Sequence, residues 1–271
     1  MYTRPPHAEK DLAVLRRLIA ENPLGSLTTA IESPTYPFLQ LSFVPFLFDA
    51  PEEGGSRAEG DGDGDGAGDA DLGRLRCHLA RQNSQSKAII KALQAQQQQQ
   101  SGASSGNILG KEVMVVFQPV QGYVTPRFYK ETKAATGKVV PTWNYTAVQI
   151  YGKAKVFFDP SARESQEFLG KQINDLTNHC ETNIMGYTGQ GSNPMAWKVS
   201  DAPERYIELR KRSLIGLEII ITRMEGKFKM SQDRTDGYIE GVIEGFDELD
   251  SETGRCMAGL VQDCHHRKNV K

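Results

Sequence analysis

The chain has 271 residues, with 32 Lys and Arg against 34 Asp and Glu, and a formal net charge of −2. This balance excludes a global positive field that would draw the protein to nucleic acid or to an anionic membrane. No apolar run reaches the roughly 18 residues that a membrane span needs, so we expect no membrane partner. The four cysteines show no C-x-x-C spacing and no apolar leader segment is visible, which predicts reduced thiols in the cytoplasm or the nucleus.

The first part of the sequence predicts a helix and two strands, followed by an insertion. Leu12, Leu15 and Leu18 recur at helical spacing, and Pro23 ends that helix. Strands are expected at 26–31 and within PFLQLSFVPFLFD, residues 37–49. The next residues, 51–71, are so rich in Gly and Asp that they cannot bury a core, and we expect a disordered acidic insertion there.

The sequence after this insertion predicts a strand, then a helix that begins near Ser84, then a second insertion. Ala88, Ile89, Ala92 and Leu93 give the helix an apolar face. A glutamine run leads from there into Ser and Gly. We therefore expect a disordered poly-Gln insertion over about residues 94–108.

The remaining chain is rich in strand patterns. The clearest strand follows VPTWNYT, where alternation predicts a buried face of Val148, Ile150, Ala154 and Val156 and an exposed face of Gln149, Tyr151, Lys153 and Lys155. A helix is expected over 161–176, two strands on either side of Glu225-Gly226, and an amphipathic helix through Ile239 and Phe246. Residues 250–271 are typical of a loose C-terminal tail.

This order of hairpins and helices has no regular βαβ alternation. It predicts an α+β fold built on a small closed or nearly closed β-barrel with flanking helices. We expect one domain over residues 1–249, interrupted by the two insertions.

Common catalytic and metal motifs are missing from the sequence. It contains no G-x-S-x-G, and no G-x-G-x-x-G follows a strand. Asp61, Asp63 and Asp65 imitate a calcium loop, but Leu72 stands where a bidentate Glu is needed. The C-terminal set Cys256, Cys264, His265 and His266 matches no zinc spacing. We therefore predict neither a catalytic side chain nor a metal site.

Three clusters of polar residues suit an anionic or heteroaromatic ligand. The first lies where a strand passes into a helix N-terminus, a place that favours a phosphate: His78, Arg81, Asn83, Ser84 and Lys87. The second offers hydroxyl, indole and amide groups: Thr142, Trp143 and Asn144. The third lies at a strand end: Lys227, Lys229, Ser231, Gln232 and Arg234.

Each cluster also has a plainer interpretation. Arg81 and Lys87 could be ordinary solvated surface charges, which is the usual place of such residues. Trp143 could be a core aromatic whose N–H finds a backbone carbonyl.

Taken together, the clusters resemble the PaiB family of FMN-binding split-barrel proteins. The family's pattern includes H-L-A-R-x-N-x-Q-x-K, V-P-T-W-N-Y-x-A-V-x-x-Y-G and K-x-K-x-S-Q-x-R, which stand here as residues 78–87, 140–152 and 227–234. The resemblance spans most of residues 1–247 and omits the two insertions. The chain departs from the family at residues 42–45, where Ser-Phe-Val-Pro replaces a common T-H-L-P, and at Asp233, which replaces a frequent Asn.

The resemblance implies a split β-barrel homodimer that binds FMN at the subunit interface. The implied cofactor ligands are His78, Arg81, Asn83, Lys87, Thr142, Trp143, Asn144, Lys229, Ser231, Gln232 and Arg234. The first cluster would hold the phosphate, the second would lie against the isoalloxazine ring, and the third would reach over from the partner subunit.

The resemblance also implies a role. It favours a flavin-dependent or flavin-sensing negative regulator of transcription, although charge and motifs do not support direct DNA binding. The alternatives are a flavin-dependent oxidoreductase that reduces a small molecule, in which the cofactor carries the chemistry, and a flavin-storing dimer without turnover. Whether the protein is an enzyme stays open at this point.

Overall fold

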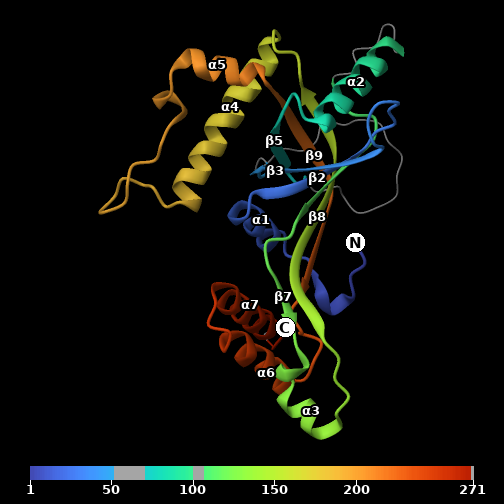
Figure 1. The fold of residues 1–271 in the computed structure, drawn as a ribbon, viewed down its shortest axis with the longest axis vertical. Coiled ribbons are helices and arrows are strands. Elements are labelled where there is room, and N and C mark those ends of the chain that lie inside the picture. The colour runs from blue at the N-terminus through green and yellow to red at the C-terminus, as the bar shows by residue number, and fades with distance from the viewer. Residues whose placement is uncertain (52–70, 100–106, 270–271) are drawn as a thin grey trace. The chain divides into compact units, whose positions relative to one another are not determined.

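The computed structural model describes residues 1–51, 71–99 and 107–269 (Figure 1). The chain divides into two compact units. Unit one comprises Met1–Leu15, Phe117–Gln149 and Glu225–Lys271, and unit two comprises Arg16–Val116 and Ile150–Met224. Two long strands, β8 (Thr142–Phe157) and β9 (Leu214–Lys229), and helix α1 (Leu12–Glu21) contribute residues to both.

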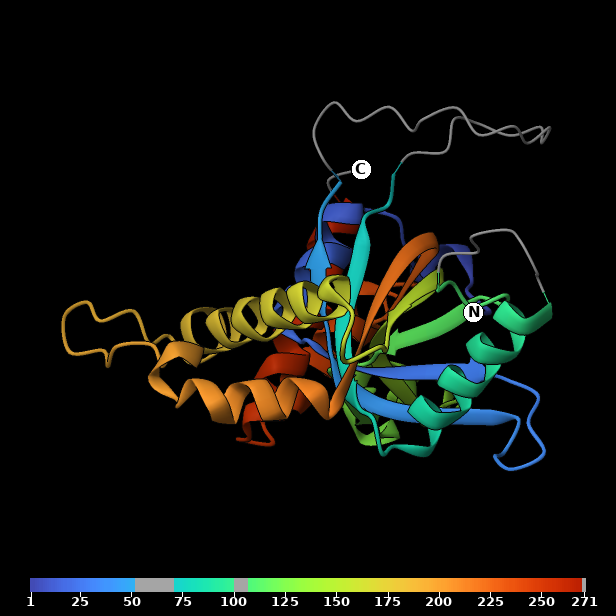
Figure 2. The same ribbon diagram turned by 90° about the horizontal axis from the view of Figure 1, so that it is seen from above.

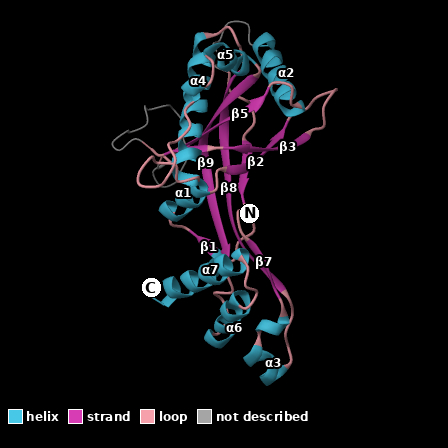
Figure 3. Cartoon of the chain, turned by 60° about the vertical axis from the view of Figure 1, so that its left-hand side comes forward, coloured by secondary structure: helices cyan, strands magenta, loops and turns pink. Residues whose placement is uncertain are grey.

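Unit two is built on a curled antiparallel sheet with the strand order β3-β2-β6-β8-β9-β5-β4. Strands β3 and β5 lie near opposite ends of this order and still contact each other, so the sheet curls into a half-barrel (Figure 3). The predicted α+β, barrel-like fold is confirmed. The remaining strands of this unit are β2 (Leu24–Ala30), β3 (Leu39–Pro45), β4 (Leu47–Asp49), β5 (Arg74–Ala80) and β6 (Val113–Phe117).

Alternating side chains fill the inside of this half-barrel. Leu27, Val115 and Leu217 are fully buried, as are the four residues predicted for the inner face of β8: Val148, Ile150, Ala154 and Val156. The period-two pattern of β8 therefore identified its buried face correctly.

Helices cover unit two. Helix α2 (Ser84–Gln99) packs on β3, and α4 (Arg163–His179) packs against β5 and against α5 (Glu204–Arg212), as Figure 2 shows. A π-helical turn, η3 (Cys180–Ile184), continues α4, and a short 3-10 turn, η4 (Val199–Asp201), precedes α5.

The predicted insertions are only partly within the described residues. The prediction of a disordered segment from residue 94 is wrong for residues 94–99, which extend α2, because glutamine is a good helix former. The prediction is also wrong for Asn107 and Ile108, which pair with β8: Asn107 O accepts from Val156 N at 2.7 Å, and Ile108 forms a bridge with Lys155. Residues 52–70 and 100–106, which make up most of both expected insertions, lie outside the described residues.

Unit one contains β7, the start of β8, the end of β9 and a helical pair. Strand β7 (Gln121–Val124) pairs with β8, and β1 (Ala8–Glu9) pairs with β9. Helices α6 (Asp236–Asp247) and α7 (Glu252–Asn269) pack on each other (Figure 1). The other elements are α3 (Lys130–Thr136) and the 3-10 turns η1 (Pro5–His7) and η2 (Pro126–Phe128).

Two sequence predictions fail in unit one. The loose tail expected from residue 250 is wrong for residues 252–269, because α7 buries Met257 and Val261 completely. The turn expected at Glu225-Gly226 is also wrong, because β9 runs through it without a break. A Cβ on Gly226 would lie 2.4 Å from Leu15 Cδ2 and 2.8 Å from Glu9 O, so this glycine makes room for β1.

The described residues contain neither a membrane-spanning helix nor a disulfide. In the parts of the chain that the structure describes, no helix is both long and apolar enough to cross a bilayer. Cys77, Cys180, Cys256 and Cys264 are all free thiols.

The acidic insertion provides a first test of the fold. Strands β4 and β5 form an antiparallel hairpin in which Asp49 lies opposite Arg74, so the two strand ends are already adjacent. Deleting residues 52–69 is expected to change the free energy of unfolding by less than about 1 kcal/mol, since closure entropy varies slowly with loop length. Chemical denaturation of the full-length and shortened chains measures this, and an insoluble shortened chain would contradict it.

Candidate functional site

The second and third predicted clusters meet in unit one. Lys229, at the end of β9, donates from Nζ to the hydroxyl of Thr142 and to the carbonyl of Trp143, the latter at 2.5 Å. Burial lowers the pKa of Lys229, and the nearby charges of Lys227 and Arg234 lower it further against the opposing effect of Asp233. Residues far apart in the sequence are thus held as one cluster, which we call the β8–β9 cluster: Thr142, Trp143, Asn144, Lys229, Ser231, Gln232 and Arg234.

Buried polar groups fix the turn that follows β9. The side-chain amide of Asn144, which is fully buried, lies 3.1 Å (Nδ2) and 3.3 Å (Oδ1) from Ser231 Oγ. Ser231 adopts a φ of 61°, a left-handed conformation that costs free energy for any residue but glycine. Gln232 accepts from Met230 N at 2.7 Å and donates to the carbonyl of Phe228. Asn144, Ser231 and Gln232 therefore shape the turn.

Aromatic side chains at this cluster are exposed. Trp143 is 52% exposed, so the plainer interpretation of a core aromatic is wrong. Tyr123 lies opposite Trp143 in the β7–β8 register, and the two rings meet edge to face with centroids 5.6 Å apart. Tyr123 is itself 48% exposed. The pair offers an open aromatic surface on which a planar ring could stack.

A charged group that the sequence analysis did not assign to any of the three clusters lies beside the turn. Asp233 is 2.9 Å from Arg4 Nη1 and 3.4 Å from the Nε2 atom of His7, which is almost fully buried. Burial raises the pKa of Asp233, but His7 and Arg234 outweigh that effect and leave it below its usual range. Burial in turn lowers the pKa of His7. No local motif marked Arg4 or His7, because only the fold brings η1 to this turn.

Arg234 is the cation that the turn presents. Its guanidinium carbon lies 5.4 Å from the centroid of Tyr238, and its Nε is 3.9 Å from Asp233 Oδ1, beyond hydrogen-bond distance. Among the described residues no carbonyl or carboxylate accepts a hydrogen bond from this guanidinium. Arg234 can therefore bind an anion without giving up a bond.

The first predicted cluster lies in unit two, where β5 passes into α2. Asn83 caps the helix, accepting from Gln85 N at 2.9 Å, and donates to Ser42 Oγ on β3 at 2.9 Å. Arg81 is used structurally, because its guanidinium donates to the carbonyls of Phe158, Arg212 and Leu214. It holds the end of β5 to two other segments of unit two.

Unused donors remain at the start of α2. Lys87 is half-buried on the first turn, and its amine forms no hydrogen bond or ion pair with the described residues. The amide nitrogen of Gln40 on β3 and the hydroxyl of Ser86 are buried, and neither has a hydrogen-bond partner in the part of the chain that the structure describes. Gln40 is close to this helix start, since its carbonyl accepts from Gln85 Nε2 at 3.2 Å. Unsatisfied buried donors are uncommon and indicate a missing acceptor.

His78 differs from its neighbours in this cluster. It is half-buried on β5, where burial lowers its pKa, and its Nδ1 has no partner. A neutral imidazole follows, which suits a hydrogen bond better than a charge interaction with a phosphate.

Comparison with known proteins identifies a family, sequence relatives and solved structures with local similarity to this chain. The family model described as "Putative FMN-binding domain" matches residues 1–223. An uncharacterized protein of Aspergillus fumigatus is 50% identical over 272 residues, covering 100% of both chains. The protease synthase and sporulation protein PAI 2 of Bacillus subtilis is 25% identical over 154 residues, 56% of this chain and 63% of its own. Among solved structures, the FAD- and haem-binding protein of Mycobacterium smegmatis gives a TM-score of 0.42 at 13% identity, covering 82% of this chain and 73% of its own.

Proposed function

Because this chain belongs to the FMN-binding domain family whose model it matches over residues 1–223, we propose that it binds FMN through its phosphate at the start of α2. The observation that carries the proposal is the pair of unused donors there, Lys87 Nζ and Gln40 Nε2, beside a helix N-terminus, whose dipole favours an anion. An FMN phosphate supplies the acceptors that these donors lack. The residues present therefore fit the cofactor.

The ring of FMN needs a second set of contacts, which we assign to the β8–β9 cluster. The open Trp143–Tyr123 pair supplies an aromatic surface, and Lys229 and Arg234 supply positive charge. Because Lys229 bonds to Thr142 and Ser231 to Asn144, the second and third predicted clusters act together. Whichever subunit contributes residues 229–234 to a site also contributes residues 142–144.

The proposed ligands suit one terminal phosphate, which favours FMN over FAD. Titration of the apoprotein with FMN, FAD and riboflavin tests this choice. We expect FMN to bind at least about tenfold more tightly than riboflavin, which lacks the phosphate and its charge-assisted hydrogen bonds. Equal affinity for riboflavin and FMN would contradict the proposal that Lys87 binds the FMN phosphate.

The bound flavin would supply electron transfer, and the protein would supply binding and orientation. We propose a flavin-dependent or flavin-sensing negative regulator of transcription. The exposed aromatic pair favours an alternative, an oxidoreductase whose ring is open to a small substrate. A salt-dependent gel shift with promoter DNA supports the regulator, and steady oxidation of a nicotinamide donor without DNA binding supports the oxidoreductase.

We also propose that the protein is a homodimer, and β3 offers the surface. This edge strand exposes three large apolar side chains on one face: Leu39, Leu41 and Phe43, which are 65%, 54% and 72% exposed. An exposed apolar edge of this kind is a liability unless a partner covers it. A second copy of the chain, with its flavin between the subunits, would bury it.

Charge placed on this face is expected to separate the subunits. Leu41→Glu with Phe43→Glu puts two like charges from each subunit into the proposed interface, which costs several kcal/mol. Sedimentation should then give a monomer where the unchanged chain gives a dimer. Leu209→Glu with Tyr206→Glu, exposed on α5, is the matched control and should leave the dimer intact. A dimer that survives the β3 changes would contradict this interface.

A further inference from the structure

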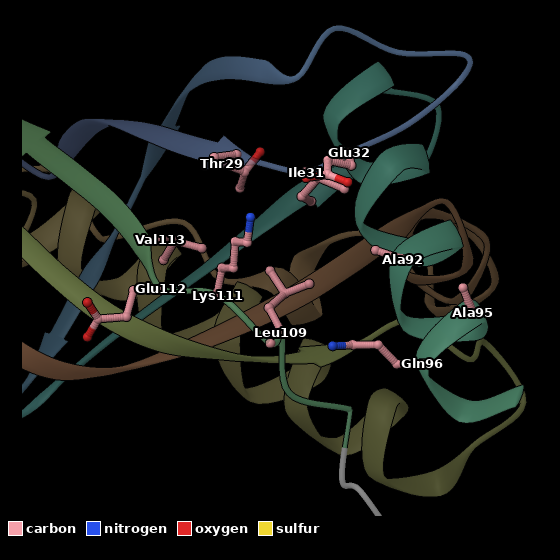
Figure 4. A pocket seen from close by; sticks show the side chains of 12 residues that line it. Thr29, Ile31, Glu32, Ala92, Ala95, Gln96, Leu109, Lys111, Glu112 and Val113 are labelled. Atoms are coloured by element: carbon pink, nitrogen blue, oxygen red, sulfur yellow. The ribbon is translucent and has the colours of Figure 1, made fainter. Parts of the chain in front are cut away.

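Unit two contains a cavity that the proposed flavin contacts do not use. It has a volume of about 500 Å³ and lies between the second half of α2, the end of β2 and the residues that lead into β6. Figure 4 shows its lining side chains, none of which belongs to the FMN ligands proposed above. Cavities of a few hundred cubic ångströms are the usual size for small-molecule sites.

The inner wall of this cavity is apolar. Leu109, Val113 and Thr29 are almost fully buried, and Ile31 and Ala92 lie beside them in the lining. The Thr29 hydroxyl is already occupied, because it accepts from Gln85 Nε2 at 3.1 Å. The wall therefore suits a hydrocarbon group rather than a polar one.

Opposite charges stand at the rim without pairing. Lys111 and Glu32 both line the cavity, and among the described residues neither forms an ion pair, with each other or with a third group. The Lys111 amine points toward Thr29, while Glu112 turns its carboxylate away (Figure 4) and accepts from the Thr222 hydroxyl at 2.5 Å. The only partner of the Lys111 amine in the described residues is the Phe38 ring, whose centroid is 5.8 Å away.

A neutral acceptor completes the polar set. Gln96 reaches from α2 into the cavity, where its Oε1 is buried and has no hydrogen-bond partner among the described residues. Its Nε2 lies 2.6 Å from where a Cβ on Gly110 would stand, so this glycine is what lets the amide fit. This acceptor lies apart from Glu32 in the lining (Figure 4), so it offers a second place for a donor.

We infer that this cavity binds a zwitterionic, amphipathic small molecule of the size of a hydrophobic amino acid. Its apolar group would pack on Leu109 and Val113. Its ammonium would donate to Glu32, and its carboxylate would accept from Lys111. The two charges on the rim differ in sign and stay unpaired, so a ligand with a single charge would leave one of them without a partner.

Three related probes test the charge pattern on the full chain by calorimetric titration. L-phenylalanine carries both charges, 3-phenylpropionate only the carboxylate, and phenethylamine only the ammonium. L-phenylalanine is expected to bind at least about tenfold more tightly than either analogue, the factor for one charge-assisted hydrogen bond. The inference would be overturned if L-phenylalanine shows no binding at millimolar concentration. It would also be overturned if either analogue binds as tightly as L-phenylalanine.

Substitutions assign each charge to its side chain. Lys111→Gln should weaken the binding of L-phenylalanine and 3-phenylpropionate and leave that of phenethylamine unchanged. Glu32→Gln should weaken the binding of L-phenylalanine and phenethylamine and leave that of 3-phenylpropionate unchanged. Lys153→Gln and Glu21→Gln, both exposed in sequence-distant parts of the chain, are the matched controls. Ala92→Phe fills the cavity and should abolish the binding of all three probes. If that variant fails to fold, Lys111→Gln and Glu32→Gln still test the site. Unchanged affinity for all three probes in both of these variants would refute it.

Discussion

Replacing Lys87 with alanine is expected to weaken FMN binding by about 1.5 to 3 kcal/mol, or roughly 10- to 150-fold in the dissociation constant. Lys87 is half-buried on the first turn of α2 and has no acceptor among the described residues. Removal of its amine therefore costs no internal bond, and the loss falls on the phosphate contact. Fluorescence titration of the apoprotein with FMN measures it.

Lys91 provides the matched control, because it lies one turn further along α2. Its amine sits 5.1 Å from the centroid of the Tyr36 ring and away from the helix start. Lys91→Ala should change FMN affinity by less than about threefold, the level of a distant surface charge. Equal losses for the two variants, or none for either, would contradict the phosphate site.

Arg81 is a poorer probe of the same site, although the sequence gives it equal weight. Its guanidinium donates to the carbonyls of Phe158, Arg212 and Leu214. Arg81→Ala would leave these acceptors without their donor and destabilise unit two. Loss of flavin in that variant could not be assigned to a phosphate contact alone.

Replacing Arg76 with methionine is expected to lower the free energy of unfolding by about 2 to 3 kcal/mol. Arg76 is almost fully buried on β5 and binds Asp49, Asp175 and, at 3.1 Å, the Gln172 amide oxygen. Breaking a buried ion pair costs about 3 to 5 kcal/mol, but these carboxylates are 39% and 35% exposed, so water recovers part of the loss. Urea denaturation measures the change.

The neighbouring Arg74 is the control for Arg76. It lies 3.6 Å from Glu218, and its side chain is 52% exposed. Arg74→Met should cost less than about 1 kcal/mol, as surface pairs do. A similar loss in the free energy of unfolding for both variants would show that burial of Arg76 does not explain the cost of its replacement.

The Arg76 network also predicts a pH dependence. Burial raises the pKa of Asp175, but Lys171 and Arg76 outweigh it and hold the pKa below its usual value. The resulting stabilisation is present above the unfolded-state pKa of about 3.9 and is lost as the pH falls through the lower folded-state value. In Arg76→Met this acid-induced loss of stability should be smaller than in the unchanged chain.

Strands in which apolar and polar residues alternate regularly could be predicted from the sequence. Strands whose course depends on contact with a segment distant in sequence could not. The β8 pattern identified Val148 and Ile150 as buried because one face meets the core along its length. Gly226 looked like a turn, since glycine usually ends strands. It lies within β9 because Leu15 and Glu9 approach it closely, and no local pattern shows that approach.

The C-terminal helix was missed because of its composition. Met257 and Val261 have helical spacing, but Cys, His and Arg surround them and hide the apolar stripe. Its burial comes from packing on α6, which is a tertiary effect.

The sequence predicted which residue types belong to the candidate site. It did not predict which of these residues contact one another. Local motifs singled out Lys229 and Thr142, but the bond between them depends on the fold. The same holds for His7 and Asp233, which the chain brings together from opposite ends. The division between ligand and scaffold also needed the structure, since Asn144 and Ser231 satisfy each other while Trp143 is open.

The most direct test of the proposed function is the identity of the chromophore that the protein carries. The purified chain, reconstituted with a mixture of FMN, FAD and riboflavin, would be freed of unbound flavin and denatured, and the released ligand identified by mass. FMN in about one copy per chain, with a flavin absorption spectrum before denaturation, is the result expected from one phosphate site in each subunit. Release of FAD or riboflavin instead, or of no flavin at all, would contradict it.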